Sequence, residues 1–305
     1  MSEVAGPGGL EVVRDGTFAT LGLLSHRLPG MLVSAHERGA VERELPGNPD
    51  VACVLAAPAL AALVPERCGL ALAADPLRAF CELHAHLCAS GFYGADEPSV
   101  VSPTARVHPA AWVAPRNVRI GAGVVVEPGA AVLEGSRLGE EVVLRAGCVV
   151  GAEGFHPRTV AGRLRLLPHA GGVDLANGVE VQSNAVVCRA LFRGDTRIGE
   201  DTKLSSLVNV SHHVRIGRRC RIGAGAVVTG SVEIGDDVWI GPHATLRNRI
   251  RVGDGASVSL GAVVVGDVAP GVRVTGSFAV EHAAFLREWR AARRRAAPRS
   301  RPGTD

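Results

Sequence analysis

The segment IGRRCRIGAGAVVTGSVEIGDDVWIGPHAT, residues 216–245, places an aliphatic side chain at every sixth position. This spacing continues without a slip over residues 198–271. The aliphatic series is Ile198, Leu204, Val210, Ile216, Ile222, Val228, Ile234, Ile240, Leu246, Val252, Val258 and Val264. Four positions after each of these comes a second small or apolar residue. Neither an amphipathic helix nor an alternating strand has this period, whereas hexapeptide repeats that wind around a prism do.

The same repeat organises an earlier part of the chain, with interruptions. It begins at Val101, slips by one residue before Ile120, and continues to Val150. Residues 151–172 break the phase, and a second interruption follows at 188–197. A loop of about 20 residues inside a solenoid is typically functional or disordered. At about three hexapeptides per coil, the repeats predict about eight coils.

The first 98 residues lack the hexapeptide phase. VACVLA (51–56) and LALAA (70–74) have the composition of buried strands, and DPLRAFCELHAHL (75–87) that of a helix capped by Asp75. The sequence therefore predicts a mainly β chain with three parts. These are a small α/β domain at 1–98, a parallel β-helix at 99–277, and a basic helix with a tail at 278–305.

Composition narrows the classes of function and compartment. The formal net charge of +3 is too close to balance to indicate a nucleic-acid partner. The seven cysteines form no CxxC pair, so we expect reduced, buried thiols in a cytoplasmic protein. The N-terminus has no signal-peptide pattern, and no apolar run is long enough to predict a membrane span.

Three segments carry a resemblance to a known family. They are ADPLRAFCELHAHL (74–87), VVGAEGF (149–155) and VNVSHHVRIG (208–217). With the order of the domains, they make the chain similar to the UDP-3-O-acylglucosamine N-acyltransferases of the lipid A pathway, within the hexapeptide-repeat acyltransferase superfamily. The resemblance implies a uridine-binding first domain, a left-handed β-helix and C-terminal helices.

The chain departs from that family at three places. The stretch GMLVSAH (30–36), where the family stacks uracil on an aromatic residue, offers Met31 and Ser34 instead. His213 stands where the family has Asn, and Arg249 stands where it has a second histidine. These departures suggest that the chemistry is kept while the acceptor has changed.

The chemistry implied is amide formation from a thioester, which needs a base for the attacking amine and donors for the oxyanion. His212 lies at or beside a prism corner, and Gly230 follows 18 residues later, one coil on. The resemblance assigns His212 the role of base and Gly230 that of oxyanion donor. The alternative is a surface corner histidine without a role in catalysis.

Other polar and aromatic residues are candidates for substrate binding, each equally compatible with a solvated corner or a loop anchor. They are Asn209, His213, His243, Phe155 and His156. His243 lies almost two coils beyond His212, so we expect it to line the same cleft. The histidines lack the H-x4-H spacing of a zinc hydratase with this fold, so the sequence predicts no metal site.

We therefore expect a homotrimeric acyltransferase that moves an acyl group from an acyl carrier protein or CoA thioester to the amine of an activated amino sugar, with no resident cofactor. Alternatives are a short-chain acyltransferase for another amine or alcohol, in secondary metabolism or surface-glycan assembly, and a non-catalytic scaffold. The last helix should bury Phe285 and Trp289. Its Arg287, Arg290, Arg294 and Arg295 either dock an acidic carrier protein or only keep the helix solvated.

Overall fold

The computed structural model describes residues 1, 10–94, 96–276 and 279–296. Its first part is an α/β domain with a five-stranded sheet in the order β1-β5-β4-β3-β2, in which only β1 is antiparallel to its neighbour. The strands are β1 (Glu11–Arg14), β2 (Thr20–Gly22), β3 (Met31–Ala35), β4 (Val51–Ala56) and β5 (Gly69–Leu72). The helical elements are α1 (Arg38–Glu44), η2 (Pro58–Leu63) and α2 (Pro76–Ala89).

Helix α2 forms where the sequence predicts it. The Asp75 carboxylate accepts a hydrogen bond from the Arg78 backbone N–H at 2.9 Å, and Pro76 occupies the first turn. Its buried face, which includes Phe80 and Leu83, packs in a core shared with Leu191 and Phe192 from the second interruption of the β-helix. The helix therefore joins the first domain to the β-helix.

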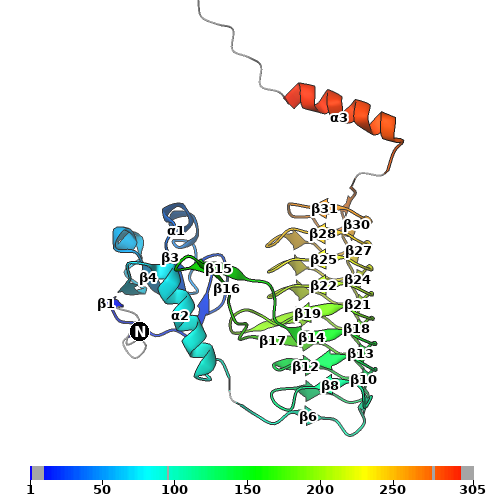
Figure 1. Cartoon of the computed structure of the whole chain (residues 1–305), viewed down its shortest axis with the longest axis horizontal. Coiled ribbons are helices and arrows are strands. Elements are labelled where there is room, and N and C mark those ends of the chain that lie inside the picture. The colour runs from blue at the N-terminus through cyan, green and yellow to red at the C-terminus, as the bar shows by residue number, and fades with distance from the viewer. Residues whose placement is uncertain (2–9, 95, 277–278, 297–305) are drawn as a thin grey trace, which may run out of the picture.

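The second part is a β-helix with three faces, each of which is a parallel sheet (Figure 1). One face contains β7 (Arg106–Val107), β10 (Val125–Val126), β13 (Val143–Leu144), β18 (Glu180–Val181), β21 (Lys203–Leu204), β24 (Arg221–Ile222), β27 (Trp239–Ile240), β30 (Ser257–Val258) and β32 (Arg273–Val274). The second contains β8 (Trp112–Val113), β11 (Ala131–Val132), β14 (Val149–Ala152), β19 (Val186–Cys188), β22 (Asn209–Val210), β25 (Val227–Val228), β28 (Thr245–Leu246) and β31 (Val263–Val264). The third contains β6 (Val100–Val101), β9 (Arg119–Ile120), β12 (Ser136–Leu138), β17 (Gly172–Leu175), β20 (Asp195–Ile198), β23 (Arg215–Ile216), β26 (Glu233–Ile234) and β29 (Arg251–Val252).

The interior of the β-helix is aliphatic. Both hexapeptide series point inward, and every aliphatic residue from Ile198 to Val264 in the first series is buried. Successive coils pair in register 18 residues apart, as between Val210 and Val228. The predicted fold is confirmed: a left-handed parallel β-helix with a small α/β domain before it and a helix after it.

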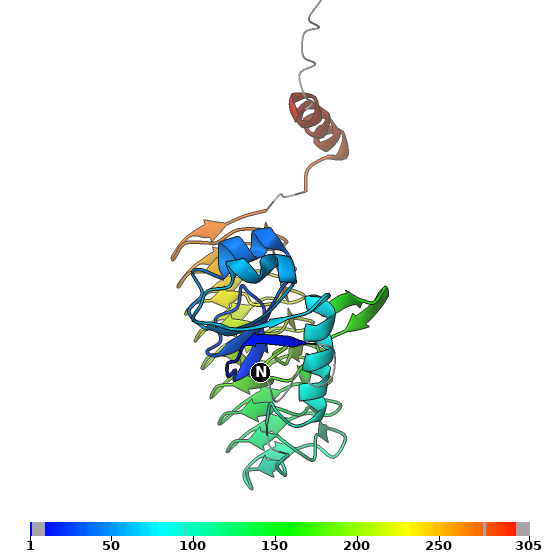
Figure 2. The same cartoon turned by 90° about the vertical axis from the view of Figure 1, so that its left-hand side faces the viewer.

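The first interruption forms a hairpin rather than an irregular loop. Strand β15 (Pro157–Val160) pairs antiparallel with β16 (Arg163–Leu166), and the hairpin lies beside α2 (Figure 2). The buried His84 of α2 anchors the end of this segment, because its Nε2 lies 2.8 Å from the Pro168 carbonyl oxygen.

The second interruption is a wedge between the two domains. Leu191 and Phe192 are fully buried, and the Phe192 ring lies 5.9 Å from Phe80 and 5.0 Å from His84 between ring centroids. The Arg193 guanidinium donates hydrogen bonds to the Ala19 and Phe92 carbonyl oxygens at 3.0 and 2.8 Å. These contacts fix the first domain against the β-helix.

Helix α3 (His282–Ala296) stands apart from the β-helix, beyond its last coils (Figure 1). Phe285 is 50% exposed and Trp289 is 46% exposed. The prediction that this helix docks an apolar face is therefore wrong for the single chain, because both anchor residues remain half in solvent. The Arg293 guanidinium lies 4.9 Å from the centroid of the Trp289 ring instead. The side chains of Arg294 and Arg295 lie outside the described residues.

Among the helices of the described residues, none combines the length and apolar character that crossing a membrane requires. The seven cysteines are all free thiols.

Candidate active site

His212 lies at the corner of the prism between β22 and β23. This corner repeats every 18 residues, and His213, Ser231 and Arg249 each adopt a left-handed backbone there, with φ of 58°, 60° and 65°. The turn aims the side chain of the preceding residue out of the prism. His212 therefore leaves the aliphatic interior and faces the first domain and the two interruptions.

Gly230 makes room for the His212 ring one coil later. A Cβ atom on residue 230 would lie 2.7 Å from Cε1 and 2.9 Å from Nε2 of His212, closer than van der Waals contact allows. The Gly230 carbonyl oxygen accepts a hydrogen bond from Arg249 N–H at 3.2 Å. In the part of the chain that the structure describes, the Gly230 N–H donates to no protein group. This amide is available to a ligand beside His212.

Four more histidines surround His212, and they come from separate segments. The ring centroids of His156, His169 and His213 lie 5.3, 5.6 and 5.7 Å from that of His212. His26, from the first domain, lies 5.0 Å from His213. The sequence analysis singled out His156 and His213, but it missed His26 and His169 because their proximity depends on how the domains pack.

His169 is held in one tautomer by backbone groups. Its Nδ1 lies 3.2 Å from the Leu167 carbonyl oxygen, which can only accept, and its Nε2 accepts from Gly154 N–H at 3.2 Å. Nδ1 of His169 therefore carries the proton. The Nε2 atoms of His156 and His213, in contrast, are buried without a hydrogen-bond partner among the described residues.

The cluster is neutral at neutral pH. Burial, together with repulsion from His169, Arg249 and Arg158, lowers the pKa of His212 to about 4. Burial also lowers the pKa of His26 to about 3, and that of His169 to about 4. A neutral imidazole retains a lone pair, so His212 is in the form that accepts a proton.

The cluster holds no arrangement typical of a metal ligand set. Among the described residues, no three His, Cys, Asp or Glu side chains come together in a way that could hold a metal ion. Backbone groups already engage both ring nitrogens of His169.

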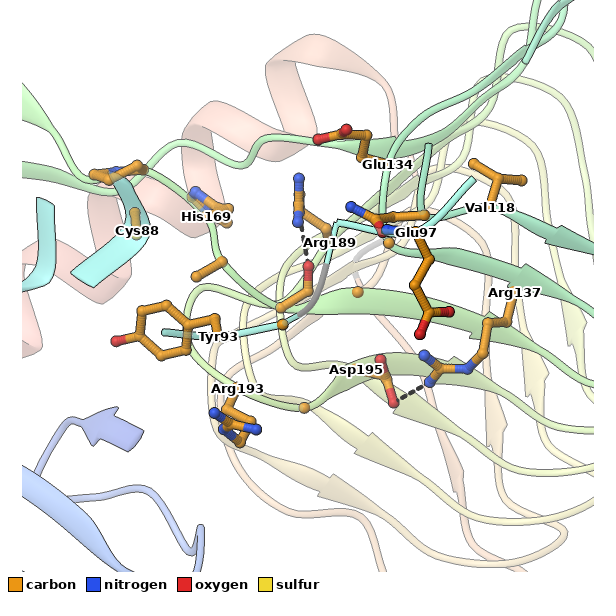
Figure 3. A pocket seen from close by; sticks show the side chains of 18 of the residues that line it. Cys88, Tyr93, Glu97, Val118, Glu134, Arg137, His169, Arg189, Arg193 and Asp195 are labelled. Atoms are coloured by element: carbon orange, nitrogen blue, oxygen red, sulfur yellow. Dashed lines mark hydrogen bonds and ion pairs between the residues drawn. The ribbon is translucent and has the colours of Figure 1, made fainter. Parts of the chain in front are cut away.

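Two cavities lie near this corner: His169 of the histidine cluster lines the first, and Arg158 and Arg249 line the second. The first, of about 690 Å³, reaches His169 and is lined by charged side chains of both signs, including Glu97, Glu134 and Arg189 (Figure 3). Arg189 Nε donates to the Gly171 carbonyl oxygen at 2.7 Å, and burial lowers the pKa of Arg189.

The second cavity, of about 530 Å³, lies between the first domain, the hairpin and the corner of the β-helix. Three arginines line it, Arg43, Arg158 and Arg249. No ion pair to an acidic side chain is recorded for Arg158 or Arg249 within the described residues. Arg158 was missed by the sequence analysis, although it lies two residues after the predicted His156.

The departures at the predicted uracil position have a structural counterpart. Met31 is fully buried in the first domain, so it does not face the cavity, whereas Ser34 lines it. The cavity also includes Phe80, but that side chain is 3% exposed and packs edge-on against Phe192. Among the described residues that line this cavity, a ligand base therefore finds no exposed phenyl, phenol or indole ring.

Among the described residues, neither Phe155 nor Asn209 forms a ring contact or a hydrogen bond with His212. Phe155 is 78% exposed, at the start of the first interruption. Asn209 lies on the flat strand β22, where its Oδ1 accepts from the Ser211 hydroxyl at 3.3 Å. Both stay predictions as substrate-binding residues.

His243 lies on another edge of the prism. It packs over Gly225 at the corner between β27 and β28, whereas His212 lies at the corner between β22 and β23. Within one chain His243 therefore does not line the His212 cleft, contrary to the expectation from sequence. The counting error arose because 31 residues is not a multiple of the 18-residue coil.

Comparisons with known proteins find the hexapeptide repeat in the segment that contains His212 and Gly230. Residues 195–230, which include both His212 and Gly230, match the bacterial transferase hexapeptide (six repeats) family model. The chain is 40% identical over 115 residues to a UDP-3-O-acylglucosamine N-acyltransferase of Caulobacter vibrioides, covering 38% of this chain and 32% of that protein. It is 30% identical over 199 residues to the protein of that name from Leptothrix cholodnii, covering 53% of this chain and 55% of that protein.

Among solved structures, the chain is similar to a UDP-N-acetylglucosamine acyltransferase from Campylobacter jejuni, with 18% identity and a TM-score of 0.46. That match covers 62% of this chain and 83% of the other. The sequence matches span about a third to about half of the length of the curated relatives. The chain is thus a hexapeptide-repeat protein similar in sequence to the UDP-3-O-acylglucosamine N-acyltransferases, which confirms the resemblance predicted from its motifs.

Proposed function

We propose that this chain is an acyltransferase that transfers an acyl group from a thioester to the amine of an activated amino sugar. The observation that carries the proposal is the pair formed by His212 and Gly230. A neutral imidazole and an unoccupied backbone N–H lie next to each other at one corner of the prism. These are the base and the oxyanion donor that acyl transfer requires.

The proposed reaction follows from this pair. The acceptor amine attacks the thioester carbonyl, and His212 removes a proton from the nitrogen as the C–N bond forms. The Gly230 N–H donates to the oxyanion of the tetrahedral intermediate. The intermediate then collapses, the C–S bond breaks, and the protonated His212 returns its proton to the leaving thiolate. The acyl thioester is a co-substrate, so this chemistry requires no resident cofactor.

The arginine-lined cavity is the proposed site of the acceptor. Arg158 and Arg249, which line this cavity, both lower the pKa of His212 by charge repulsion, which supports a link between the cavity and the base. Unpaired guanidinium groups suit the phosphate oxygens of an activated sugar, which they can bind with paired hydrogen bonds. An acceptor anchored there would present its amine toward the corner.

A second acceptor class remains, a different amine or alcohol that takes a short acyl group. It is favoured by the burial of Met31 and Phe80, since among the described lining residues a uracil base finds no exposed phenyl, phenol or indole ring to stack on. The two classes differ in the acceptor and share the His212 chemistry.

The test is direct detection of product. Purified protein is incubated with acyl-carrier-protein and acyl-CoA thioesters of several lengths and with UDP-linked and free amino sugars, and mass spectrometry identifies acylated products. Replacing His212 with Ala should lower kcat by about 10²- to 10⁴-fold, the usual range for loss of a general base. Thermal stability should be retained. Equal turnover by the His212→Ala variant would remove this residue from the mechanism.

We further propose that the active species is a homotrimer, as expected from the flat faces of the prism. Light scattering at micromolar concentrations should give a mass close to three chains of 31.6 kDa each. A mass near one chain would contradict it.

A further inference from the structure

The backbone of the second interruption fixes the tautomer of His213. The Leu191 N–H donates to His213 Nδ1 at 3.3 Å. A backbone N–H can only donate, so Nδ1 of His213 must be unprotonated. The neutral ring then carries its proton on Nε2, the atom that is buried without a partner among the described residues.

This assignment determines the protonation of the next ring. His213 Nδ1 also lies 3.4 Å from His212 Nδ1. If both atoms were unprotonated, two lone pairs would face each other at hydrogen-bond distance, which is repulsive. His212 Nδ1 therefore carries a proton and donates a hydrogen bond to His213 Nδ1, whose single lone pair it shares with the Leu191 N–H. The lone pair of His212 is left on Nε2, the nitrogen 2.9 Å from the Cβ position of residue 230.

We propose that His213 is a positioning residue which, set by the Leu191 N–H, holds His212 in the tautomer that presents Nε2 as the base. The kinetic part of this inference rests on the proposed function, but the tautomer does not. The interruption at 188–197 thereby ties the first domain to the base.

Burial and backbone hydrogen bonds hold Leu191, His213 and His212 in place. Leu191 is fully buried, and the neighbouring Phe192 ring lies 6.2 Å from the His213 ring. The His213 backbone N–H donates to the hydroxyl of the buried Thr196 at 2.9 Å. The His212 carbonyl oxygen accepts from Ser231 N–H at 3.0 Å. Both histidines are therefore anchored through their backbones as well as their rings.

If His213 only filled space, an apolar side chain of similar size should replace it without loss of activity. A buried N–H without a partner destabilises a protein, so an apolar side chain of similar size would serve packing better. Leucine is suited to the test because Leu207 already adopts φ of 62° at the corner six residues earlier. Asparagine is the matched rescue, since its Oδ1 can replace Nδ1 as acceptor and it tolerates positive φ.

The first experiment reads the tautomer without any assay of activity. Long-range ¹H–¹⁵N correlation spectra of protein labelled at histidine report which ring nitrogens carry protons, and a His212→Gln variant assigns the signals. In the parent and in His213→Asn, His212 should be protonated on Nδ1 alone. In His213→Leu it should become a mixture or shift to Nε2–H. A parent His212 protonated on Nε2 would overturn the proposal.

The second experiment measures kcat and KM for the two variants with the substrates found above. His213→Leu should lower kcat by about 10-fold or more with KM nearly unchanged, because the base loses its tautomer rather than its place. His213→Asn should restore most of kcat and leave the melting temperature nearly unchanged, because it keeps an acceptor for the Leu191 N–H. A matching loss of kcat and stability in both variants would show a packing role. If no acyl transfer is found at all, the proposed function fails while the spectra still decide the tautomer.

Discussion

The regular coils from residue 198 onward and the two interruptions before them are built on different physical principles. In the coils each repeat buries an aliphatic side chain, as Ile222 and Ile240 do, and sends polar side chains to solvent. In the interruptions the chain leaves the prism and buries polar groups near the first domain, including the His169 side chain. The corner at His212 is where the two regions meet.

The difference separates stability from chemistry. Stacked aliphatic layers provide a rigid support in which a neighbour lies 18 residues away at a fixed distance. Such layers present no ionisable group to a substrate. The first interruption adds the neutral histidines His156 and His169, and the Nε2 of His156 has no hydrogen-bond partner within the described residues. Buried polar groups of this kind cost stability, and they concentrate where binding or catalysis needs them.

Among the tests of this difference between coils and interruptions, we expect the largest effect on kcat from adding one methyl group at Gly230. Gly230→Ala would place a Cβ atom 2.7 Å from His212 Cε1, so the ring must move away from the donor amide. We expect kcat to fall about 10²-fold, the loss seen when one oxyanion donor is misplaced. Gly266→Ala is the matched control, since no atom lies within 4 Å of its added Cβ. Equal kcat in the two variants would show that Gly230 is only another glycine of the repeat.

Much of this arrangement could be predicted from sequence. The period of six determines which side chains face inward, and the interval of 18 residues brings His212 and Gly230 together without knowledge of the rest. The Asp75 cap and the helix that follows it depend only on local residues, and they form as predicted.

What could not be predicted depends on packing between parts far apart in the chain. No periodicity connects His26 of the first domain to His213, whose rings lie 5.0 Å apart. The residues 188–197 were recognised as an interruption, but their role as a wedge depends on Phe192 entering a core made with Phe80. The prediction for His243 was wrong because its separation from His212, 31 residues, is not a whole number of 18-residue coils, so the two side chains lie on different edges of the prism.

A smaller effect concerns pH and stability. In the folded chain burial lowers the pKa of His26 to about 3, with Arg249, His212 and Arg27 adding repulsion, whereas the ordinary value is 6.5. Between these values the unfolded chain binds a proton that the folded chain does not. The contribution of His26 to the free energy of unfolding is therefore fully present above pH 6.5, and it is lost as the pH falls toward 3.

Urea unfolding between pH 7.5 and 4.5 would measure this slope. One such histidine contributes about 1.4 kcal/mol of unfolding free energy per pH unit within the window. His26→Gln should flatten the slope by about that amount. His108→Gln is the control, because His108 is exposed on the far part of the β-helix and its replacement should leave the slope unchanged. Identical slopes in parent and His26→Gln would show that His26 is already charged in the folded state.

The smallest effect concerns α3, which belongs to neither region. It stands away from the prism (Figure 1) and carries arginines that can pair with the carboxylates of an acidic carrier protein. If it docks such a donor, replacing Arg287 and Arg290 with Glu should raise KM for an acyl-carrier substrate by a few-fold, about 1 kcal/mol or less. It should also flatten the dependence of this KM on ionic strength, while KM for a short pantetheine thioester stays the same.

The control moves the same charge to another place. Arg106 and Arg273 are exposed on the β-helix, and replacing both with Glu changes the net charge equally, provided that light scattering shows an unchanged mass. A carrier-protein dock on α3 requires that only the α3 variant discriminates between the two donors. If both variants raise KM alike, the effect is one of total charge. The arginines then serve to keep an exposed helix solvated, and the donor is recognised elsewhere on the prism.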